Sequence, residues 1–373
     1  MKSAILLTFS LLGAQAHAAA ALDLAPGVWK DITPPGVTMT PASHVFCQGV
    51  TLDPGDPLTI YLCVCAYEVD KAGLFKTTDG GATWNKIGQL DEPLHLEIDP
   101  KDHQHLYCVD GVRGKTIGFW ESHDGGANWS SPPGFKTATD HPPTGVGTSD
   151  LYSIAVDPLD FKHVLVSFHS PWANSRNCGV LESTDGGASW TARQPPSGSE
   201  GGYGMAIFFL SAPETKQGDA KTWLFTAQQG GFFRTTDGGT TWTIVYPLQM
   251  THGGNQLYRT KDGTLYAGGY QYPVRSTDNG TSWQPLKNGL PYSWYIGICG
   301  DGTNLYTGCT GEHQPVFTSP EADGLTWKPL PGGAQTFSTD PFEMRVDRVH
   351  HILYSATFGN GFFAIKVAGA ADK

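Results

Sequence analysis

Thr77-Thr78-Asp79-Gly80-Gly81-Ala82-Thr83-Trp84 is the stretch that decides the fold, because the chain repeats it. Further copies of the same pattern follow along the chain: Ser122 to Trp129, Ser183 to Trp190, Thr235 to Trp242, Ser276 to Trp283, and a degenerate copy ending in Asp323-Gly324-Leu325-Thr326-Trp327. Self-similarity of this kind is typical of repeat architectures. We call each copy, of pattern S/T-x-D-x-G-x-x-W, a box.

The residue types of the box predict a structural role. Asp and Ser/Thr side chains can accept hydrogen bonds from backbone N–H groups in a tight turn, and Gly tolerates the positive φ that such a turn requires. The Trp can pack across the hairpin and cover the edge of a sheet. Because the same Asp occurs at every repeat, we interpret it as part of the repeat rather than as a catalytic or calcium-binding residue.

Between the boxes, the sequence indicates three further strands per unit. An apolar strand ends in a turn such as Leu52-Asp53-Pro54 or Ile98-Asp99-Pro100, two strands follow, and the Trp of the box opens a fourth. The three-strand set occurs seven times, but the last set, ending at Lys366, has no box after it. Trp29 to Pro34 resembles a fourth strand standing alone. The sequence therefore predicts an all-β fold, a single seven-bladed β-propeller of four-stranded antiparallel blades whose ring the N-terminal strand closes.

The N-terminal segment reads as a secretory signal. Lys2 is followed by the apolar run from Ala4 to Ala14 and by the small-x-small site Ala16-His17-Ala18. We expect a signal peptide at 1–18, an N-terminal lead at 19–27, the propeller at 28–367 and a C-terminal tail at 368–373. The chain is therefore expected to be secreted, in the extracellular space or the periplasm.

Composition and charge restrict the classes of partner that the chain is expected to bind. The formal net charge is −11 and no Lys/Arg cluster occurs, which argues against nucleic acid and anionic lipid as partners. No segment is long and apolar enough to insert into a membrane.

The seven cysteines form no CxxC pattern. Two alternatives remain open for the cysteines. Either disulfides form, joining Cys47 to Cys63 or Cys65 or joining Cys299 to Cys309, or the thiols are buried and free.

The boxes and the D-P turns resemble those of the Asp-box (BNR repeat) propellers, a group that includes sialidases, two-propeller xyloglucanases, sortilin-type receptor domains and a photosystem II assembly factor. The resemblance covers the mature chain and implies the fold. It does not transfer an activity. The R-I-P segment typical of sialidases is missing. The xyloglucanases place two catalytic aspartates in a cleft between two propellers, whereas this chain is expected to form one. The assembly factor carries a basic patch, whereas this chain has an acidic net charge.

Candidate site residues gather on the face of the ring opposite the boxes, where loops lead into the first strands and join second to third strands. The candidate catalytic residues are His95, Tyr152, His169 and His252. The candidate substrate-binding residues are His44, Arg113, Trp172, Arg176, Tyr203, Gln228, Tyr270 and Tyr295. Aromatic and amide side chains suit sugars, since rings stack on C–H faces and amides bind hydroxyls. Insertions near Thr137 to Asp150 and Gln194 to Gly202 are expected to overhang the mouth.

Three classes of function fit these residues. The first is a carbohydrate-active enzyme, with His and Tyr sharing the proton transfers of a polysaccharide lyase and an Arg binding a uronate carboxylate. The second is a glycoside hydrolase, which needs two facing carboxylates, and the sequence singles out no such pair. The third is a propeller that binds a glycan or a protein without catalysis. We expect an oligo- or polysaccharide partner, a monomer and no cofactor. A His-bound divalent metal at His95, His169 and His252 is the alternative to a metal-free site.

Overall fold

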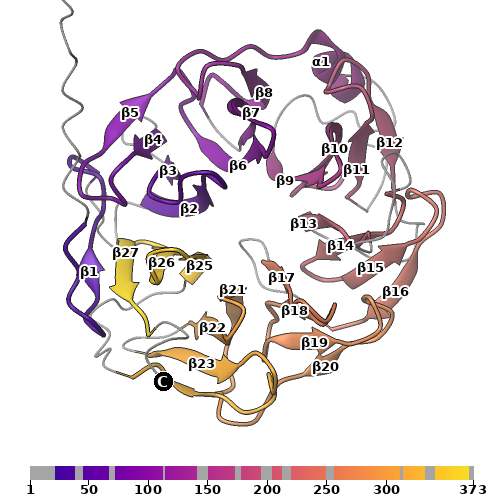
Figure 1. Cartoon of the computed structure of the whole chain (residues 1–373). Coiled ribbons are helices and arrows are strands. Elements are labelled where there is room, and N and C mark those ends of the chain that lie inside the picture. The colour runs from indigo at the N-terminus through magenta and orange to yellow at the C-terminus, as the bar shows by residue number, and fades with distance from the viewer. Residues whose placement is uncertain are drawn as a thin grey trace, which may run out of the picture.

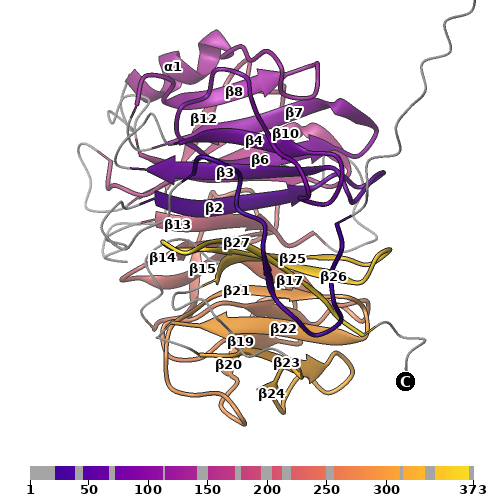
Figure 2. The ribbon, with the colours of Figure 1, turned by 90° about the vertical axis from the view of Figure 1, so that its left-hand side faces the viewer.

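Seven antiparallel sheets stand around a central axis, as the sequence predicts (Figure 1). This computed structural model describes residues 22–37, 45–66, 72–111, 114–140, 150–172, 178–194, 204–211, 220–248, 256–310, 314–331 and 341–368. Seen edge-on, the strands run between the two faces of the ring (Figure 2). No helix in the described part of the chain has the length and apolar character that crossing a bilayer requires.

Six blades use consecutive strands and the last adds β1 to β25, β26 and β27; the first strand of each set lies innermost (Figure 1). The innermost strands are β2 (Val45–Leu52), β6 (Pro93–Asp99), β9 (Leu151–Asp157), β13 (Gly204–Phe209), β17 (Leu257–Arg259), β21 (Tyr295–Gly300) and β25 (Pro341–Asp347). The second strands are β3 (Ile60–Ala66), β7 (Asp102–Asp110), β10 (Asp160–Phe168), β14 (Trp223–Ala227), β18 (Leu265–Ala267), β22 (Asn304–Cys309) and β26 (Ile352–Thr357). The third strands are β4 (Gly73–Thr77), β8 (Gly118–Ser122), β11 (Val180–Ser183), β15 (Gly231–Thr235), β19 (Val274–Ser276), β23 (Val316–Pro320) and β27 (Gly361–Lys366).

The fourth strands are short and lie at the rim: β5 (Asn85–Ile87), β12 (Thr191–Arg193), β16 (Thr243–Tyr246), β20 (Gln284–Pro285), β24 (Lys328–Pro329) and, in the last blade, β1 (Lys30–Asp31). The second blade has a single bridge, Glu121 to Ser130, at the place of a fourth strand. Its two backbone hydrogen bonds, 2.8 and 2.9 Å long, run in both directions. We number the blades 1 to 7 from β2 onward.

The box forms the turn between the third and fourth strands, and its polar side chains build that turn. In the first box, Asp79 Oδ1 accepts hydrogen bonds from the Thr77 hydroxyl at 2.6 Å and from the Thr83 amide at 2.9 Å. In the fourth, bonds from the Thr241 amide and hydroxyl lower the pKa of Asp237 to about 2. The structural interpretation of the box therefore agrees with its geometry: its aspartates are occupied within the turn.

The N-terminal strand closes the ring. Lys30 and Asp31 pair with Ala364 and Phe363 of β27, and the Ile32 amide donates to the Phe362 carbonyl at 2.8 Å. The indole N–H of Trp84, from the box of blade 1, donates to the Ile32 carbonyl at 2.8 Å. The closing segment is therefore bonded both to blade 7 and to blade 1 (Figure 1).

Apolar side chains pack mainly between adjacent blades. One cluster joins Val50 and Ile60 of blade 1 to Tyr354 and Phe362 of blade 7. Successive apolar residues of one strand face opposite neighbours, so each sheet contributes to two cores. All seven cysteines are buried free thiols, which decides between the alternatives left open by the sequence.

The helix α1 (Pro133–Asp140) is a feature that the box pattern does not predict. Phe135 on α1 is fully buried, with ring centroids 6.0 Å from Phe119 and 5.3 Å from Trp190. Residues 137–140, expected to overhang the mouth, instead belong to this helix, which packs beside the box of blade 3. Residues 141–149 and 195–203 lie outside the described ranges, as do residues 1–18, where the sequence predicts a signal peptide.

Candidate functional site: the mouth of the central channel

The alternation of strand direction gives the ring two distinct faces. The boxes and the turns between first and second strands lie on one, which we call the box face. The loops from second to third strands and from one blade into the next lie on the other, which we call the loop face. A ligand that contacts several blades at once can do so where these seven sets of loops converge.

β-Bulges at the starts of the innermost strands shape the channel at the loop face. Register shifts occur near the loop-face ends of β2, β6, β9, β13, β21 and β25. A bulge adds an unpaired residue and re-aims its side chain. A narrow cavity of about 50 Å³ is lined by the residues at these bulges: Gln48, Leu94, Tyr152, Met205, Ala206 and Phe342. Tyr152 therefore lies at the channel, as the sequence predicts.

His95, Gln256 and Glu343 line both this cavity and a second one, of about 330 Å³, which extends toward the box face. They therefore mark the constriction between the two. His95 Nε2 lies 3.5 Å from Glu97 Oε1, and Glu343 is paired with Arg345. Burial raises the pKa of Glu97, partly offset by the charges of His95 and Arg345. His95 thus faces the channel beside a carboxylate, at the level where the two cavities adjoin.

His169 lies at the loop-face end of β10 and stacks on Tyr152, with ring centroids 4.8 Å apart. Its Nδ1 is 3.4 Å from Asp150 Oδ1, and the Ser170 hydroxyl also bonds this carboxylate. The His169 amide donates to the Asp150 carbonyl at 2.8 Å. Asp150 adopts a positive φ of 61°, which is uncommon for a residue other than glycine. The structure therefore brings together two of the predicted catalytic residues, with a carboxylate behind the imidazole.

The predicted substrate-binding residues fall into three groups. Trp172 and Tyr295 are 1% and 0% exposed, and the Tyr295 hydroxyl donates to the Pro291 carbonyl at 2.7 Å. Both pack in the core, so we remove them from the residues expected to contact a ligand. Gln228 and Tyr270 are half-buried in loops on the loop face. The remaining residues lie outside the described ranges, together with the predicted catalytic His252: His44, Arg113, Arg176 and Tyr203.

Four aromatic side chains form what we call the aromatic platform on the loop face of blades 5 and 6: Tyr270, Tyr272, Tyr292 and Trp294. The rings of Tyr270 and Trp294 are 5.3 Å apart, and those of Tyr272 and Tyr292 are 5.8 Å apart and perpendicular. Tyr292 is 65% exposed and Trp294 40%. Of these four residues, Tyr270 is among the candidate site residues given above, and Trp294 was not predicted.

Backbone hydrogen bonds fix the loops that carry the aromatic platform. The Ser293 amide donates to the Gln271 carbonyl at 3.1 Å, and the Thr310 amide donates to the Trp294 carbonyl at 3.0 Å. Gly269 and Tyr295 exchange two bonds of 2.8 and 2.9 Å. Because both loops are bonded to each other, the rings keep their arrangement without a ligand, which lowers the entropy cost of binding one.

A second aromatic group lies on the same face, where blades 1 and 7 meet. Phe358 stacks on Phe46 at 4.3 Å and on Phe342 at 5.5 Å. Phe358 is 40% exposed. Among the described residues, the three strongly exposed aromatic side chains are Tyr292, Trp294 and Phe358, and all three lie on the loop face. These exposed rings make the loop face the candidate binding surface.

Carboxylates on the loop face are held by the protein itself. Asp91 accepts hydrogen bonds from the Thr116 hydroxyl at 2.6 Å and the Lys115 amide at 2.8 Å. Asp110 is fully buried and accepts the Glu92 amide at 3.1 Å. Burial, with the nearby charges of Asp91 and Glu92, raises the pKa of Asp110 to about 8. These acids therefore position loops.

Replacing Asp110 with asparagine is expected to change how stability depends on pH. The folded state holds the Asp110 proton up to about pH 8, whereas the unfolded chain releases it near pH 4. Wild-type stability is therefore lost as pH rises through this window, by up to about 1.4 kcal/mol per pH unit, and the asparagine variant lacks this loss. Urea unfolding of both proteins from pH 5 to 8 measures it. Parallel curves for the two proteins would show that Asp110 is not protonated.

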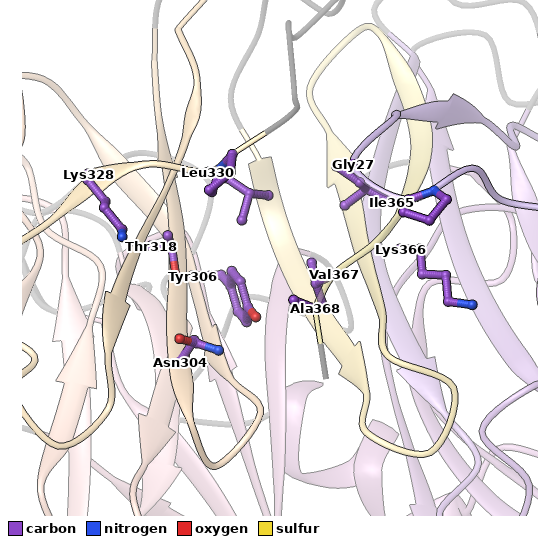
Figure 3. Close-up of a pocket in the computed structure, with 12 residues that line it drawn as sticks. Gly27, Asn304, Tyr306, Thr318, Lys328, Leu330, Ile365, Lys366, Val367 and Ala368 are labelled. Carbon is purple, nitrogen blue, oxygen red and sulfur yellow. The ribbon is translucent and has the colours of Figure 1, made fainter. Parts of the chain in front are cut away.

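A larger cavity, of about 620 Å³, lies between blades 6 and 7 where the ring closes (Figure 3). Tyr306, Thr318 and Lys328 line one side, and Gly27, Ile365 and Val367 line the other (Figure 3). Among the described residues, its lining includes neither an imidazole nor a carboxylate, the commonest proton-transfer groups, and its one aromatic side chain, Tyr306, is buried. We therefore place the candidate site at the loop face.

Comparison with known proteins supports the propeller fold and links it to polysaccharide enzymes. No known family profile matches the chain. A xyloglucanase from a Paenibacillus species is 27% identical over 274 residues, which is 63% of this chain and 26% of that protein. A xyloglucanase of Hypocrea jecorina is 25% identical over 281 residues, 64% of this chain and 32% of the relative. The chain thus spans about a quarter to a third of the length of these relatives.

Solved structures give the same result for the fold. The GH74 xyloglucanase from Xanthomonas campestris superposes with a TM-score of 0.65 at 16% identity, covering 92% of this chain and 54% of that one. YCF48 from Cyanidioschyzon merolae superposes with a TM-score of 0.61 at 11% identity, covering 91% of this chain and 98% of that one. The chain is a seven-bladed propeller that resembles both, and at such identities the likeness concerns the fold alone.

Proposed function

We propose that this chain is a carbohydrate-active propeller that binds a xyloglucan-type polysaccharide across the loop face. The observation that carries the proposal is the aromatic platform, whose exposed Tyr292 and Trp294 rings can stack on the C–H faces of sugars. The similarity to xyloglucanases supports a neutral glucan as the ligand. The signal pattern at 1–18 supports a place outside the cytoplasm.

Hydrolysis is the second candidate function, and it is favoured over the lyase reaction. The curated relatives are xyloglucanases, which are glycoside hydrolases, and none of those compared is a lyase. We therefore place glycoside hydrolysis ahead of the lyase reaction that the sequence favoured.

The experiment that tests the proposed function is a panel of soluble polysaccharides applied to the purified chain. We expect retardation on xyloglucan gels in affinity electrophoresis, and weaker or no retardation on uronate-rich pectin. Reducing ends measured after incubation detect hydrolysis, and an ultraviolet-absorbing double bond detects elimination. Binding to xyloglucan with neither product supports a binding propeller. Absence of retardation on every neutral glucan would overturn the proposal.

A further inference from the structure

We propose that His105, Glu121 and His123 bind a divalent transition-metal ion on the box face, between blades 2 and 3. This site is remote in the topology from the loop face and does not depend on the proposed function. One ligand atom from each side chain lies within 4.8 Å of the others. Glu121 Oε1 is 2.8 Å from His105 Nε2 and 3.3 Å from His123 Nε2. Tetrahedral zinc, with bonds of about 2.0–2.2 Å, spaces its ligand atoms by roughly these distances.

A carboxylate lies behind one of the proposed ligands. His105 Nδ1 is 3.5 Å from Asp99 Oδ2, so the nitrogen that faces away from Glu121 can donate to an acid. Metal-binding histidines commonly donate their second N–H to a carboxylate, which fixes the tautomer and orients the ring. Asp99 also accepts the Lys101 amide at 2.8 Å, which holds its side chain in the turn. His105 is thus positioned to present Nε2 to a metal ion.

Blade 3 provides an internal comparison, because it contains the same acid–histidine–acid chain without a second histidine. His163 Nδ1 is 3.5 Å from Asp157, and its Nε2 is 3.1 Å from Glu182. There, Arg193 neutralises Glu182 through two contacts of 2.8 and 2.9 Å. A guanidinium is always charged, so this blade has a permanent cation of its own.

Blade 2 lacks that cation. Ser130 pairs with Glu121 in blade 2, as Thr191 pairs with Glu182 in blade 3. Two residues further along the chain, blade 2 therefore has Pro132 where blade 3 has Arg193. His123 occupies the variable second position of the box, where blade 3 has Thr184. Glu121 thus has no arginine partner here and contacts a second imidazole, that of His123, besides that of His105. Together the three side chains have the donor set of a His₂Glu metal site. A bound metal ion would supply the charge that the guanidinium supplies in blade 3.

The site is open to solvent, as metal entry requires. The His123 side chain is 65% exposed, and the three side chains line a cavity of about 330 Å³. Four charged side chains line this cavity or contact His105. Three are carboxylates, Asp99, Glu121 and Asp185, and one is a cation, Lys162. The local charge therefore favours a cation.

This cluster differs from the metal site that the sequence suggested. Within the described ranges, His105, Glu121 and His123 form the one group of three donors close enough to share an ion. His95 and His169 belong to no such group there, and His252 lies outside these ranges. The inference therefore concerns the box face.

The test is titration of tag-free protein with Zn²⁺ against a chromophoric chelator. We expect one zinc ion per chain at the proposed site, and at least a tenfold weaker zinc affinity in His123→Ala. Because His123 is exposed, this variant should keep the wild-type melting temperature without metal. Asp99→Asn, which alters the orientation of His105 but removes no ligand, should weaken binding tenfold to a hundredfold.

His103→Ala is the matched control, because His103 is another box-face histidine beside a carboxylate, Asp53, at 2.8 Å. We expect its zinc affinity to equal that of the wild type. Equal zinc affinity in wild type and His123→Ala would overturn the proposal. So would a loss of zinc affinity in His103→Ala as large as the loss in His123→Ala. Titration with Co²⁺ in place of Zn²⁺ adds a second readout. A visible absorption band as intense as that of tetrahedral Co²⁺ should appear in the wild type and be lost in Glu121→Gln.

Discussion

Replacing Gln256 with alanine is expected to lower the free energy of unfolding by about 4 kcal/mol, because this buried amide joins three blades. Gln256 Oε1 accepts hydrogen bonds from the Ile298 amide at 3.0 Å and the Met344 amide at 3.1 Å, and its Nε2 donates to the Met344 carbonyl at 2.6 Å. Each buried group left without a partner costs about 1–3 kcal/mol, and alanine leaves three such groups at the channel constriction.

Urea unfolding of the variant against wild type measures this effect. Gln284→Ala is the matched control, because Gln284 is an exposed residue of β20 whose side chain should contribute less than about 0.5 kcal/mol. A loss in Gln256→Ala no larger than in Gln284→Ala would show that inter-blade bonds at the channel do not stabilise the ring.

The double variant Tyr292→Ala, Trp294→Ala is expected to bind xyloglucan at least about 100-fold more weakly than the wild type. Aromatic residues that act as binding hot spots contribute about 2 kcal/mol or more each, and two such losses exceed a hundredfold change in Kd. Isothermal titration with a xyloglucan oligosaccharide gives the ratio. Both side chains are solvent-exposed, so the melting temperature should change little.

Two controls accompany that double variant. Tyr292→Phe keeps the ring and should retain most of the affinity, which separates stacking from hydrogen bonding by the hydroxyl. Val349→Ala removes an apolar side chain, 67% exposed, from a turn on the box face and should leave affinity unchanged. An affinity in the double variant within threefold of wild type would remove the aromatic platform from the account.

The fold could be predicted from the sequence because the signals that specify it are local and repeated. The Thr77 to Trp84 box and its copies fix a turn by side-chain bonds within five residues. Ring closure could be predicted because the set ending at Lys366 lacks a fourth strand and Trp29 to Pro34 supplies one. Helix α1 could not, because its one buried aromatic, Phe135, depends on the outer edge of two other blades.

The candidate site was harder to predict, because it depends on how blades meet. Side chains such as Tyr152 reach the channel through bulges, which depend on the register of strand pairing. Tyr295 begins an innermost strand as predicted but faces the core, whereas its neighbour Trp294 faces solvent. A one-residue change of position reverses the direction of a side chain in a strand. His123 occupies a variable box position, and only the neighbouring strands reveal its partners Glu121 and His105.

Oxidative footprinting of the chain with and without a xyloglucan oligosaccharide tests the central claim, that a polysaccharide lies across the loop face. Hydroxyl radicals label exposed aromatic rings, and mass spectrometry locates the labels. We predict that the ligand protects Tyr292 and Trp294 and leaves the labelling of Trp242, a half-buried box tryptophan, unchanged. Protection of Trp242 with no change at Tyr292 and Trp294 would contradict the account.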